Sequence, residues 1–260
     1  MILAILQARL SSSRLPGKVL LPILGMPMIG RQIERIRRSR RVDALTIATS
    51  VESSDDPLAA YGVSIGVPVF RGSLEDVLDR FHRAAAPWKP SHVVRLTGDC
   101  PLADAGVIDI TIDRAVAGGF DYVANSMPPT WPDGLDVEVV RFPVLETAWC
   151  EARLRSEREH VTPFVYNHPE RFSLGTLASP RDLSTWRLTV DYRADFDLVT
   201  RVYEALHPDK PDFAFDDVVA FLDRRPDLLA ANRDIVRNEG FAKSLALDAA
   251  TPSHSMDTRP

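Results

Sequence analysis

In residues 5–18, ILQARLSSSRLPGK, an apolar segment runs directly into a polar loop. The apolar part belongs to residues 2–6, which we interpret as a strand buried on both faces. The loop holds three cations, Arg9, Arg14 and Lys18, separated by small and hydroxyl residues. Backbone N–H groups and positive charges that converge at the end of a strand can bind several anionic oxygens together. The sequence therefore predicts a phosphate site at the end of this strand.

The spacing within the loop narrows the kind of phosphate site. The Gly-x4-Gly-Lys-Ser/Thr pattern of the P-loop is absent, so a P-loop nucleotidase is not indicated. We expect Arg14 and Lys18 to neutralise a triphosphate, while the backbone around the loop lies close to the nucleotide. The alternative to a phosphate-binding loop is a solvated surface loop without a ligand, which the preceding buried strand disfavours. The residues expected to contact the nucleotide here are Gln7, Ala8, Arg9, Ser12, Arg14 and Lys18.

Composition places limits on the class of protein. The chain has 260 residues, 45% hydrophobic, which is enough for one large α/β domain or two small ones. Its formal net charge of −5 gives no reason to expect nucleic acid as a partner. No apolar run approaches the ~20 residues that cross a bilayer, and the first residues do not resemble a signal peptide. Cys100 and Cys150 lack zinc-ligand spacing, so we expect a reducing, cytoplasmic location.

Short apolar runs alternate with longer helical patterns along the chain. This alternation predicts an α/β protein with a mostly parallel sheet covered by helices on both faces. We expect a single domain over residues 1–240, within which 125–180 interrupts the α/β rhythm, and a disordered tail over 241–260. The expected strands are 2–6, 45–49, 67–70, 92–97, 121–124, 135–140, 172–177 and 187–190; the main expected helices are 28–38, 74–86, 105–117, 143–153, 158–166, 194–205 and 216–222.

Two acidic residues follow expected strands and are candidates for a metal site. Asp99 comes directly after the strand at 92–97, and Asp191 after the segment at 187–190. Ligands of such sheets lie beyond the carboxyl ends of the strands, where these two residues are expected to meet. A Mg²⁺ ion needs one or two carboxylates together with phosphate oxygens. Asp104 fits the cap of the following helix better than Asp99 does, so a capping role is left to Asp104.

Other polar residues suggest a place for a second substrate. Asp136 and Glu138 lie two apart on an expected strand and would share one face, where paired carboxylates can bind hydroxyl groups. Arg158 and His160 could meet an anionic acceptor. A solvated strand face and a helix N-terminus explain the same four residues equally well. Two further nucleotide-binding candidates are Arg71 and Thr97, which lie at or just past strand ends.

In these motifs the chain resembles the SpsF-like cytidylyltransferases, relatives of the CMP-Kdo and CMP-acylneuraminate synthetases. The resemblance implies the three-layer α/β/α nucleotide-diphospho-sugar transferase fold. It also implies transfer of CMP from CTP to an acidic sugar or a related acceptor such as a phosphonate, with release of pyrophosphate. The motifs that carry it are residues 7–18, 25–27, 95–102, 133–138, 158–163 and 188–191.

The resemblance also implies roles for individual residues. By motif position, Arg14 and Lys18 bind the phosphates, Asp99 and Asp191 hold Mg²⁺, and Arg14, Lys18 and Asp99 form the catalytic set. Relatives are often homodimers, with residues 125–180 the candidate contact segment here.

Two other functions remain open from the sequence. One is a glycosyltransferase that uses a nucleotide sugar; such enzymes commonly carry Asp-x-Asp, whereas this chain has only Asp99 in Asp-Cys-Pro. The other is a non-catalytic nucleotide-binding protein. Use of UTP or another nucleotide in place of CTP is also open.

Overall fold

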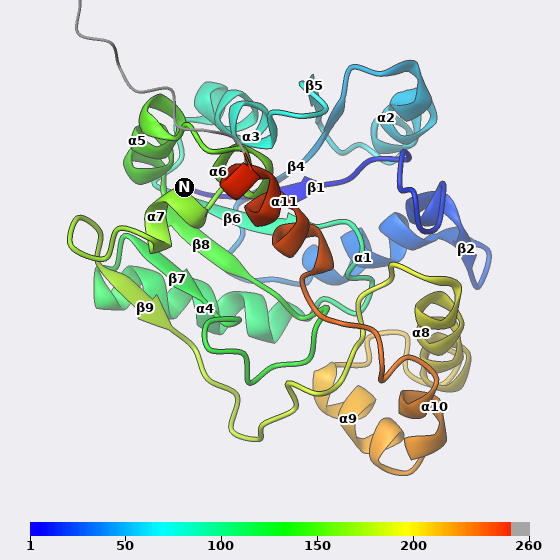
Figure 1. Ribbon diagram of the computed structural model, residues 1–260. Coiled ribbons are helices and arrows are strands. Elements are labelled where there is room, and N and C mark those ends of the chain that lie inside the picture. Colours follow the sequence, from blue (N-terminus) through cyan, green and yellow to red (C-terminus); the bar gives the residue numbers. More distant parts are fainter. Residues whose placement is uncertain (251–260) are drawn as a thin grey trace, which may run out of the picture.

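A central seven-stranded sheet organises the chain, which a computed structural model describes over residues 1–250 (Figure 1). The strand order is β5-β4-β1-β6-β8-β7-β9, so the first strand lies inside the sheet with neighbours on both sides. The strands are β1 (Ile2–Gln7), β4 (Ala44–Ser50), β5 (Val69–Gly72), β6 (His92–Thr97), β7 (Tyr122–Ala124), β8 (Glu138–Arg141) and β9 (Leu174–Thr176). A separate small hairpin is formed by β2 (Pro22–Ile23) and β3 (Met26–Pro27).

One strand makes the otherwise parallel sheet mixed. Strands β5, β4, β1 and β6 run parallel, with Leu6 opposite both Ile47 and Leu96. Strand β8 then pairs antiparallel with β6 on one side and β7 on the other. Because β1 and β6 end side by side, the loops after Gln7 and Thr97 start from the same edge of the sheet. This edge is where an α/β sheet of this kind binds ligands.

Helices cover both faces, which confirms the predicted three-layer α/β/α arrangement (Figure 1). The α-helices are α1 (Met28–Ile36), α2 (Asp56–Ser64), α3 (Val77–Ala85), α4 (Ala105–Gly118), α5 (Phe142–Glu151), α6 (Arg155–His160), α7 (Pro163–Tyr166), α8 (Arg193–Leu206), α9 (Phe215–Asp223), α10 (Pro226–Ala230) and α11 (Glu239–Ala250). Short 3-10 turns occupy η1 (Lys18–Leu20), η2 (Ser53–Asp55) and η3 (Ala86–Trp88).

The two faces of β1 pack into different cores. Ala4 and Leu6 belong to the core that includes residues of α1, α4 and α8. Leu3 and Ile5 belong to the core that includes residues of α3 and α5. Successive side chains of a strand point to opposite faces, so a strand with a helix layer on each side must be apolar throughout. This is the physical reason why residues 2–6 lack polar alternation.

The C-terminal part of the chain differs from the sequence expectation in two places. Residues 241–250 belong to helix α11, which packs beside α6, so the expectation of a disordered tail is wrong for these residues (Figure 1). Residues 251–260, the rest of that expectation, lie outside the described part of the chain. Residues 187–190 form no strand; a single bridge joins Arg187 to Asp133.

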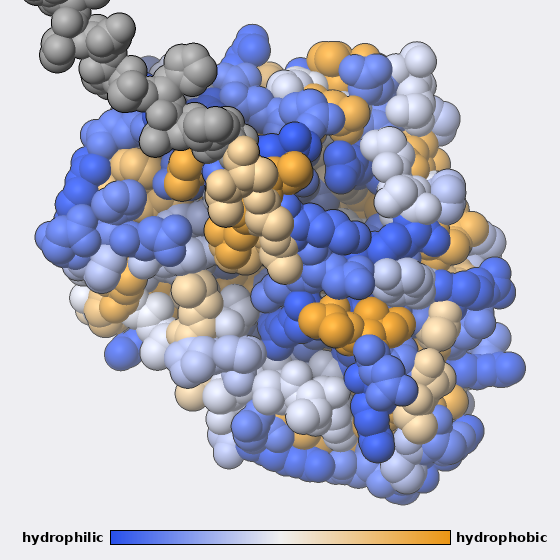
Figure 2. All heavy atoms as spheres, in the orientation of Figure 1, coloured by the Kyte–Doolittle hydropathy of each residue, from blue (hydrophilic) through white to orange (hydrophobic). Residues whose placement is uncertain are grey.

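Segment 125–180 contributes β8 and β9 to the main sheet and α5 to one of its two cores. No helix in residues 1–250 is long and apolar enough to span a membrane. In Figure 2, apolar side chains lie over α11 and hydrophilic ones lie on the surface beside it.

Candidate active site

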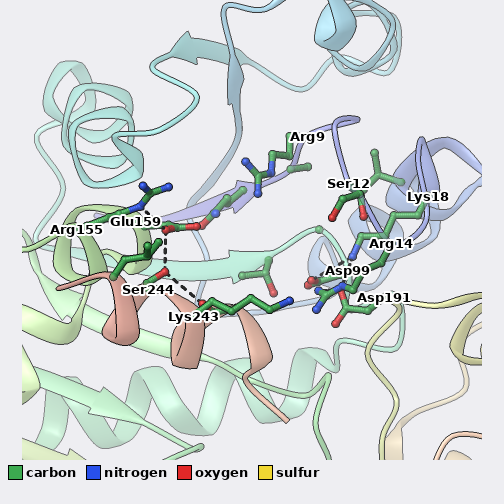
Figure 3. A pocket seen from close by; sticks show the side chains of 18 residues that line it. Arg9, Ser12, Arg14, Lys18, Asp99, Arg155, Glu159, Asp191, Lys243 and Ser244 are labelled. Atoms are coloured by element: carbon green, nitrogen blue, oxygen red, sulfur yellow. Dashed lines mark hydrogen bonds and ion pairs between the residues drawn. The ribbon is translucent and has the colours of Figure 1, made fainter. Parts of the chain in front are cut away.

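A cavity of about 410 Å³ opens at the carboxyl ends of β1 and β6 (Figure 3). The loop after β1, the loop after β6 and helix α11 form its walls. The position agrees with the prediction that the ligand lies beyond these strand ends. Of the expected nucleotide contacts, the cavity is lined by Gln7, Ala8, Arg9, Ser12, Arg14, Lys18, Thr97 and Asp99, together with Asp191.

The two acidic residues expected to form a metal site lie on either side of Lys18. The Lys18 ammonium donates to Asp191 Oδ1 at 2.8 Å and lies 3.5 Å from Asp99 Oδ2. Arg14 donates to the same Asp191 oxygen at 2.5 Å, and its other terminal nitrogen donates to Glu239 at 3.1 Å. The structure therefore brings together two cations and two acids that are 177 positions or fewer apart in the sequence.

Asp191 carries its negative charge at neutral pH. Burial raises the pKa of its carboxyl, but the charges of Lys18 and Arg14 and the hydrogen bond from Arg187 outweigh burial, so the net shift is downward. Asp99 is more available, since 29% of its side chain is exposed and its one ion pair, with Lys18, is long. Asp99 is thus the acid of this pair with room for a further cation.

The buried side chain of Arg187 fixes the position of Asp191. Its guanidinium is 6% exposed and donates to Asp133 at 2.8 Å, to Asp191 at 2.9 Å and to Asp195 at 3.0 Å. Asn232 donates a further hydrogen bond to Asp195 at 2.8 Å. One buried cation therefore holds three carboxylates, and it orients the one that faces the cavity.

A second cavity, of about 390 Å³, adjoins the first and shares Arg14, Thr97, Asp99 and Asp191 with it. Asp136 and His160, two of the four residues expected to bind an acceptor, line this second cavity. Both cavities have Asp99 and Asp191 in their walls. Two molecules, one bound in each cavity, would therefore lie next to each other at these acids. The arrangement suits two substrates that react with one another.

The acids of the second cavity are close enough to affect each other. Burial and the negative charge of Asp136 raise the pKa of Asp133 to about 7, against the opposing charges of Arg237 and Arg187. Burial also raises the pKa of Asp136, which accepts a hydrogen bond of 2.5 Å from Arg237. This cavity consequently presents carboxyl groups that can accept or donate hydrogen bonds near neutral pH.

His160 is held neutral in the wall of the second cavity. Burial, reinforced by the charge of Arg95, lowers its pKa to about 4. Its Nε2 lies 3.1 Å from Ser244 Oγ, and its ring packs edge-on against Phe241 at 5.0 Å between centroids. The imidazole is thus placed by helix α11, and it offers no positive charge to an anionic acceptor.

Glu138 and Asp136 do not share one ligand face, contrary to the sequence interpretation. Strand β8 begins at Glu138, so Asp136 lies in the loop before the strand, where the alternation of faces does not apply. Glu138 accepts hydrogen bonds from Arg95, Thr162 and the Tyr122 hydroxyl, the last at 2.8 Å. It supports Arg95 and lines neither of the two cavities.

The structure does not bring Arg158 and Arg71 into the two cavities, because both guanidinium groups have partners elsewhere. Arg158 pairs with Asp76 at 2.5 Å and donates to the Trp149 carbonyl at 2.8 Å. Arg71 donates to two backbone carbonyls at 2.9 Å and pairs with Asp56 at 2.7 Å. Neither lines the two cavities.

Sequence reasoning missed five cations in these walls, namely Arg95, Arg155, Arg187, Arg237 and Lys243. Arg95 lies in the 95–102 motif, but the sequence alone does not show to which face of the sheet its side chain points. Arg237 and Lys243 lie at or beyond the end of the expected domain. Helix α11 lacks a strong apolar stripe, so no periodicity indicated it.

The surroundings of Cys100 suppress the reactivity of its thiol. It is buried, and burial together with the charge of Asp99 raises the pKa of the thiol well above its usual value. The thiolate is the reactive form, so Cys100 is a poor nucleophile here. The other cysteine, Cys150, is exposed on α5.

The donor set fits Mg²⁺ only if phosphate oxygens contribute. Residues 1–250 contain no group of three or more His, Cys, Asp or Glu side chains placed to hold a metal ion. Asp99 and Asp191 offer carboxylate oxygens beside Lys18, which is the protein contribution Mg²⁺ commonly has in nucleotide sites.

The family model for cytidylyltransferases matches residues 3–211, which include both strand-end loops and Asp191. The chain belongs to the cytidylyltransferase family. This cytidylyltransferase is 36% identical over 235 residues to the spore coat polysaccharide biosynthesis protein SpsF of Bacillus subtilis, covering 87% of this chain and 95% of SpsF. The predicted SpsF-like family and nucleotidyltransferase class are thus confirmed.

Solved structures agree with this assignment. A cytidylyltransferase from Leptospira borgpetersenii is 31% identical and superimposes with a TM-score of 0.83 over 88% of this chain and 96% of that one. A CMP:2-keto-3-deoxy-manno-octonic acid synthetase, solved in complex with CTP, is 17% identical with a TM-score of 0.60, over 78% of this chain and 98% of its own. The latter likeness supports the nucleotidyltransferase fold alone.

Proposed function

We propose that this cytidylyltransferase transfers CMP from CTP to an acidic sugar or a related anionic acceptor, with Mg²⁺ and with release of pyrophosphate. The observation that carries the proposal is the pair of adjoining cavities that share Asp99 and Asp191. The first cavity has the cations that a triphosphate needs, and the second is open to an acceptor. CTP as the donor is supported by the family and by the synthetase whose structure contains CTP.

The residues of the first cavity would position and neutralise the triphosphate. Arg14 and Lys18 would lower the negative charge that an attacking oxygen must approach, and the loop at Ala8 would pack against the nucleotide. Mg²⁺, when bound to Asp99 and Asp191, would neutralise phosphate charge and orient the leaving pyrophosphate. Catalysis then comes mainly from holding the acceptor oxygen in line with the α-phosphorus.

Different residues of the second cavity would bind the anionic group and the hydroxyl groups of the acceptor. Arg95 lines it, and the Nε of Arg95 is buried without a hydrogen-bond partner within residues 1–250, so an anionic group of the acceptor could bind there. Asp136 and Asp133 would bind hydroxyl groups nearer the phosphate site. His160 would contribute a neutral hydrogen-bonding group, consistent with its lowered pKa.

A pyrophosphate-release assay tests the proposal. Each of the four ribonucleoside triphosphates is combined with Mg²⁺ and a panel of ulosonic acids, other sugar acids and phosphonates. We expect release with CTP and at least one anionic acceptor. Turnover of a nucleotide sugar without pyrophosphate would instead identify a glycosyltransferase, and CTP binding without turnover on the whole panel would indicate a non-catalytic nucleotide-binding protein.

Asp99→Asn tests the metal role in the same assay. Asparagine keeps the shape but removes the charge, so we expect Mg²⁺-dependent turnover to fall at least about 100-fold, the usual scale for losing a major electrostatic contribution. The melting temperature should change little, because the one ion pair of Asp99 is partly exposed. Asp113→Asn is the matched control, since Asp113 forms an exposed pair with Arg41 on the surface of α4. Full activity of Asp99→Asn would contradict the assignment.

Two further proposals are a homodimer, which follows from the family resemblance, and a cytoplasmic location, which follows from the cysteine usage. Light scattering on the purified full chain would test the first, with twice the 28.9 kDa chain mass expected.

A further inference from the structure

Helix α11 closes the side of the first cavity that faces the strand ends. Gly240, Lys243, Ser244 and Leu247 all line that cavity, at the spacing of one face of a helix (Figure 3). The opposite wall is the loop after β1, including Arg9. Residues more than 230 positions apart in sequence thus form two walls of one cavity.

Side-chain hydrogen bonds hold α11 in this position along its length. At its start, Glu239 accepts hydrogen bonds from Arg14 at 3.1 Å and from the Tyr192 hydroxyl at 3.0 Å. In its middle, Ser244 donates to Glu159 at 2.8 Å. Near its end, Asp248 accepts from the backbone N–H of Ser156 at 3.2 Å. Lys243 lies between the first two of these attachments, so the backbone that carries it is fixed relative to the cavity.

Lys243 and Arg9 are the cations of this cavity that have no hydrogen-bonded or ion-paired partner within residues 1–250. Among the described residues, neither forms a hydrogen bond or ion pair through its charged group, whereas Arg14 and Lys18 both bind Asp191. In Figure 3 the Lys243 side chain runs from α11 into the cavity toward the side where Arg14 and Asp99 lie. The cavity therefore has one uncommitted positive charge on each wall.

The charges of the lining match a metal-bound triphosphate. The cavity has five cations, Arg9, Arg14, Lys18, Arg155 and Lys243, and three carboxylates, Asp99, Glu159 and Asp191. The excess of two positive charges equals the charge of about −2 on a nucleoside triphosphate that carries one Mg²⁺. Without Lys243 the excess falls to one.

We propose that Lys243 is a triphosphate-binding residue, supplied by α11 on the wall opposite Arg9. The inference rests on the proposed function only in that the ligand is a nucleoside triphosphate. A lysine ammonium is a flexible point charge that suits contact with non-bridging phosphate oxygens. The C-terminal helix is accordingly part of the active site rather than an appendage of the domain.

Binding of inorganic tripolyphosphate with Mg²⁺, measured by calorimetry on the full chain, tests this inference directly. We expect Lys243→Met to weaken tripolyphosphate and CTP binding by about tenfold or more, as expected when a charge-assisted contact is lost. Binding of CMP, which lacks the outer phosphates, should change less than about twofold. Lys243→Arg should retain most of the affinity, because it keeps the positive charge.

Lys89→Met is the matched control, since Lys89 is an exposed lysine that lines neither cavity. Its tripolyphosphate affinity should equal that of the wild type. Because the Lys243 ammonium forms no hydrogen bond or ion pair within residues 1–250, Lys243→Met should also nearly keep the wild-type melting temperature, which separates a binding defect from a folding defect.

The outcomes also separate this inference from the proposed reaction. Unchanged tripolyphosphate binding in Lys243→Met, or no binding by the wild type, would overturn the role of Lys243. If Lys243→Met loses affinity but no acceptor supports pyrophosphate release, the phosphate site stands and the proposed reaction fails. If the wild type turns over CTP while Lys243→Met binds normally, the reaction stands and the inference fails.

Discussion

Arg187→Met is the substitution whose effect follows most directly from the geometry. The variant keeps the length and much of the apolar volume of the side chain but removes the buried guanidinium. That group donates to Asp133, Asp191 and Asp195, all at 3.0 Å or less. We expect the folded chain to lose substantial stability, because charges that remain buried after their partner is removed are costly.

The remaining contacts of the three acids set the magnitude. Asp191 keeps Lys18 and Arg14, and Asp195 keeps hydrogen bonds from Asn232 and from two backbone N–H groups. Removing one partner of a buried ion pair costs about 3–5 kcal/mol. Three ion pairs are lost here, but Asp191 and Asp195 keep the other partners just named. We therefore expect the total loss of stability to lie within this range. At about 2–4 °C per kcal/mol for a chain of this size, the melting temperature should fall by about 6–20 °C.

Urea unfolding of the two proteins at several pH values provides the measurement. Loss of Arg187 should raise the folded-state pKa of each of the three carboxyl groups, and the pKa of Asp133 is already about 7 with Arg187 present. A carboxyl whose pKa is raised on folding stabilises the fold at low pH and loses that contribution as pH rises toward the folded-state pKa. The stability deficit of Arg187→Met should therefore widen from pH 5 to pH 8.

An exposed arginine provides the control for this experiment. Arg201 pairs with Glu204 on the surface of α8, with 68% and 44% of the two side chains exposed. Arg201→Met should cost less than about 1 kcal/mol, as surface pairs do. If Arg187→Met proved no more destabilising than Arg201→Met, the account of a buried cation that organises three acids would be refuted.

The other predictions concern the backbone and pH. Gly134→Ala should destabilise the fold by more than about 3 kcal/mol in urea unfolding, because Gly134 has a φ of 104° and a Cβ would lie 2.4 Å from a backbone nitrogen. Gly66→Ala, at a φ of 68° with open space around the Cβ, should cost only about 1–2 kcal/mol; equal losses would show that the contact at Gly134 is unimportant. His160 has a pKa lowered to about 4, so its unfolded form binds more protons between pH 4 and 6.5, and stability should fall as pH drops through this window. His160→Gln should lose less stability between pH 7 and 5 than the wild type, and an identical pH profile would contradict the burial of the imidazole.

The sequence predicts the sheet and much of one cavity for physical reasons that act locally. Strand β6 matches its predicted range, since a short segment rich in Val and Leu that ends at turn residues is typical of a strand. The sequence predicts that Arg14, Lys18 and Asp99 lie close together because they follow buried strands, whose carboxyl ends meet at one edge of a parallel sheet, and all three line one cavity. Asp191 lines the same cavity, although the strand expected before it does not form.

The errors arise where a contact partner far along the chain decides the outcome. Arg158 was expected to bind an acceptor because it is charged and lies in a recognised motif, but Asp76, 82 positions away, engages it. The segment at 187–190 is strongly apolar at alternate positions, but Arg187 turns inward to three acids and only one bridge forms. Helix α11 has little apolar periodicity, because hydrogen bonds to α6 and Arg14 position it instead of an apolar stripe.

The unequal exposure of the two cysteines has a practical consequence for following α11 and the cavity it closes. Cys150 is the accessible thiol, while Cys100 is enclosed and resists ionisation. A maleimide dye added at neutral pH should attach to Cys150 on α5, outside both cavities. Cys100 therefore does not have to be replaced before labelling. A second dye on a new cysteine in α11 would then report by energy transfer how far that helix travels when nucleotide arrives.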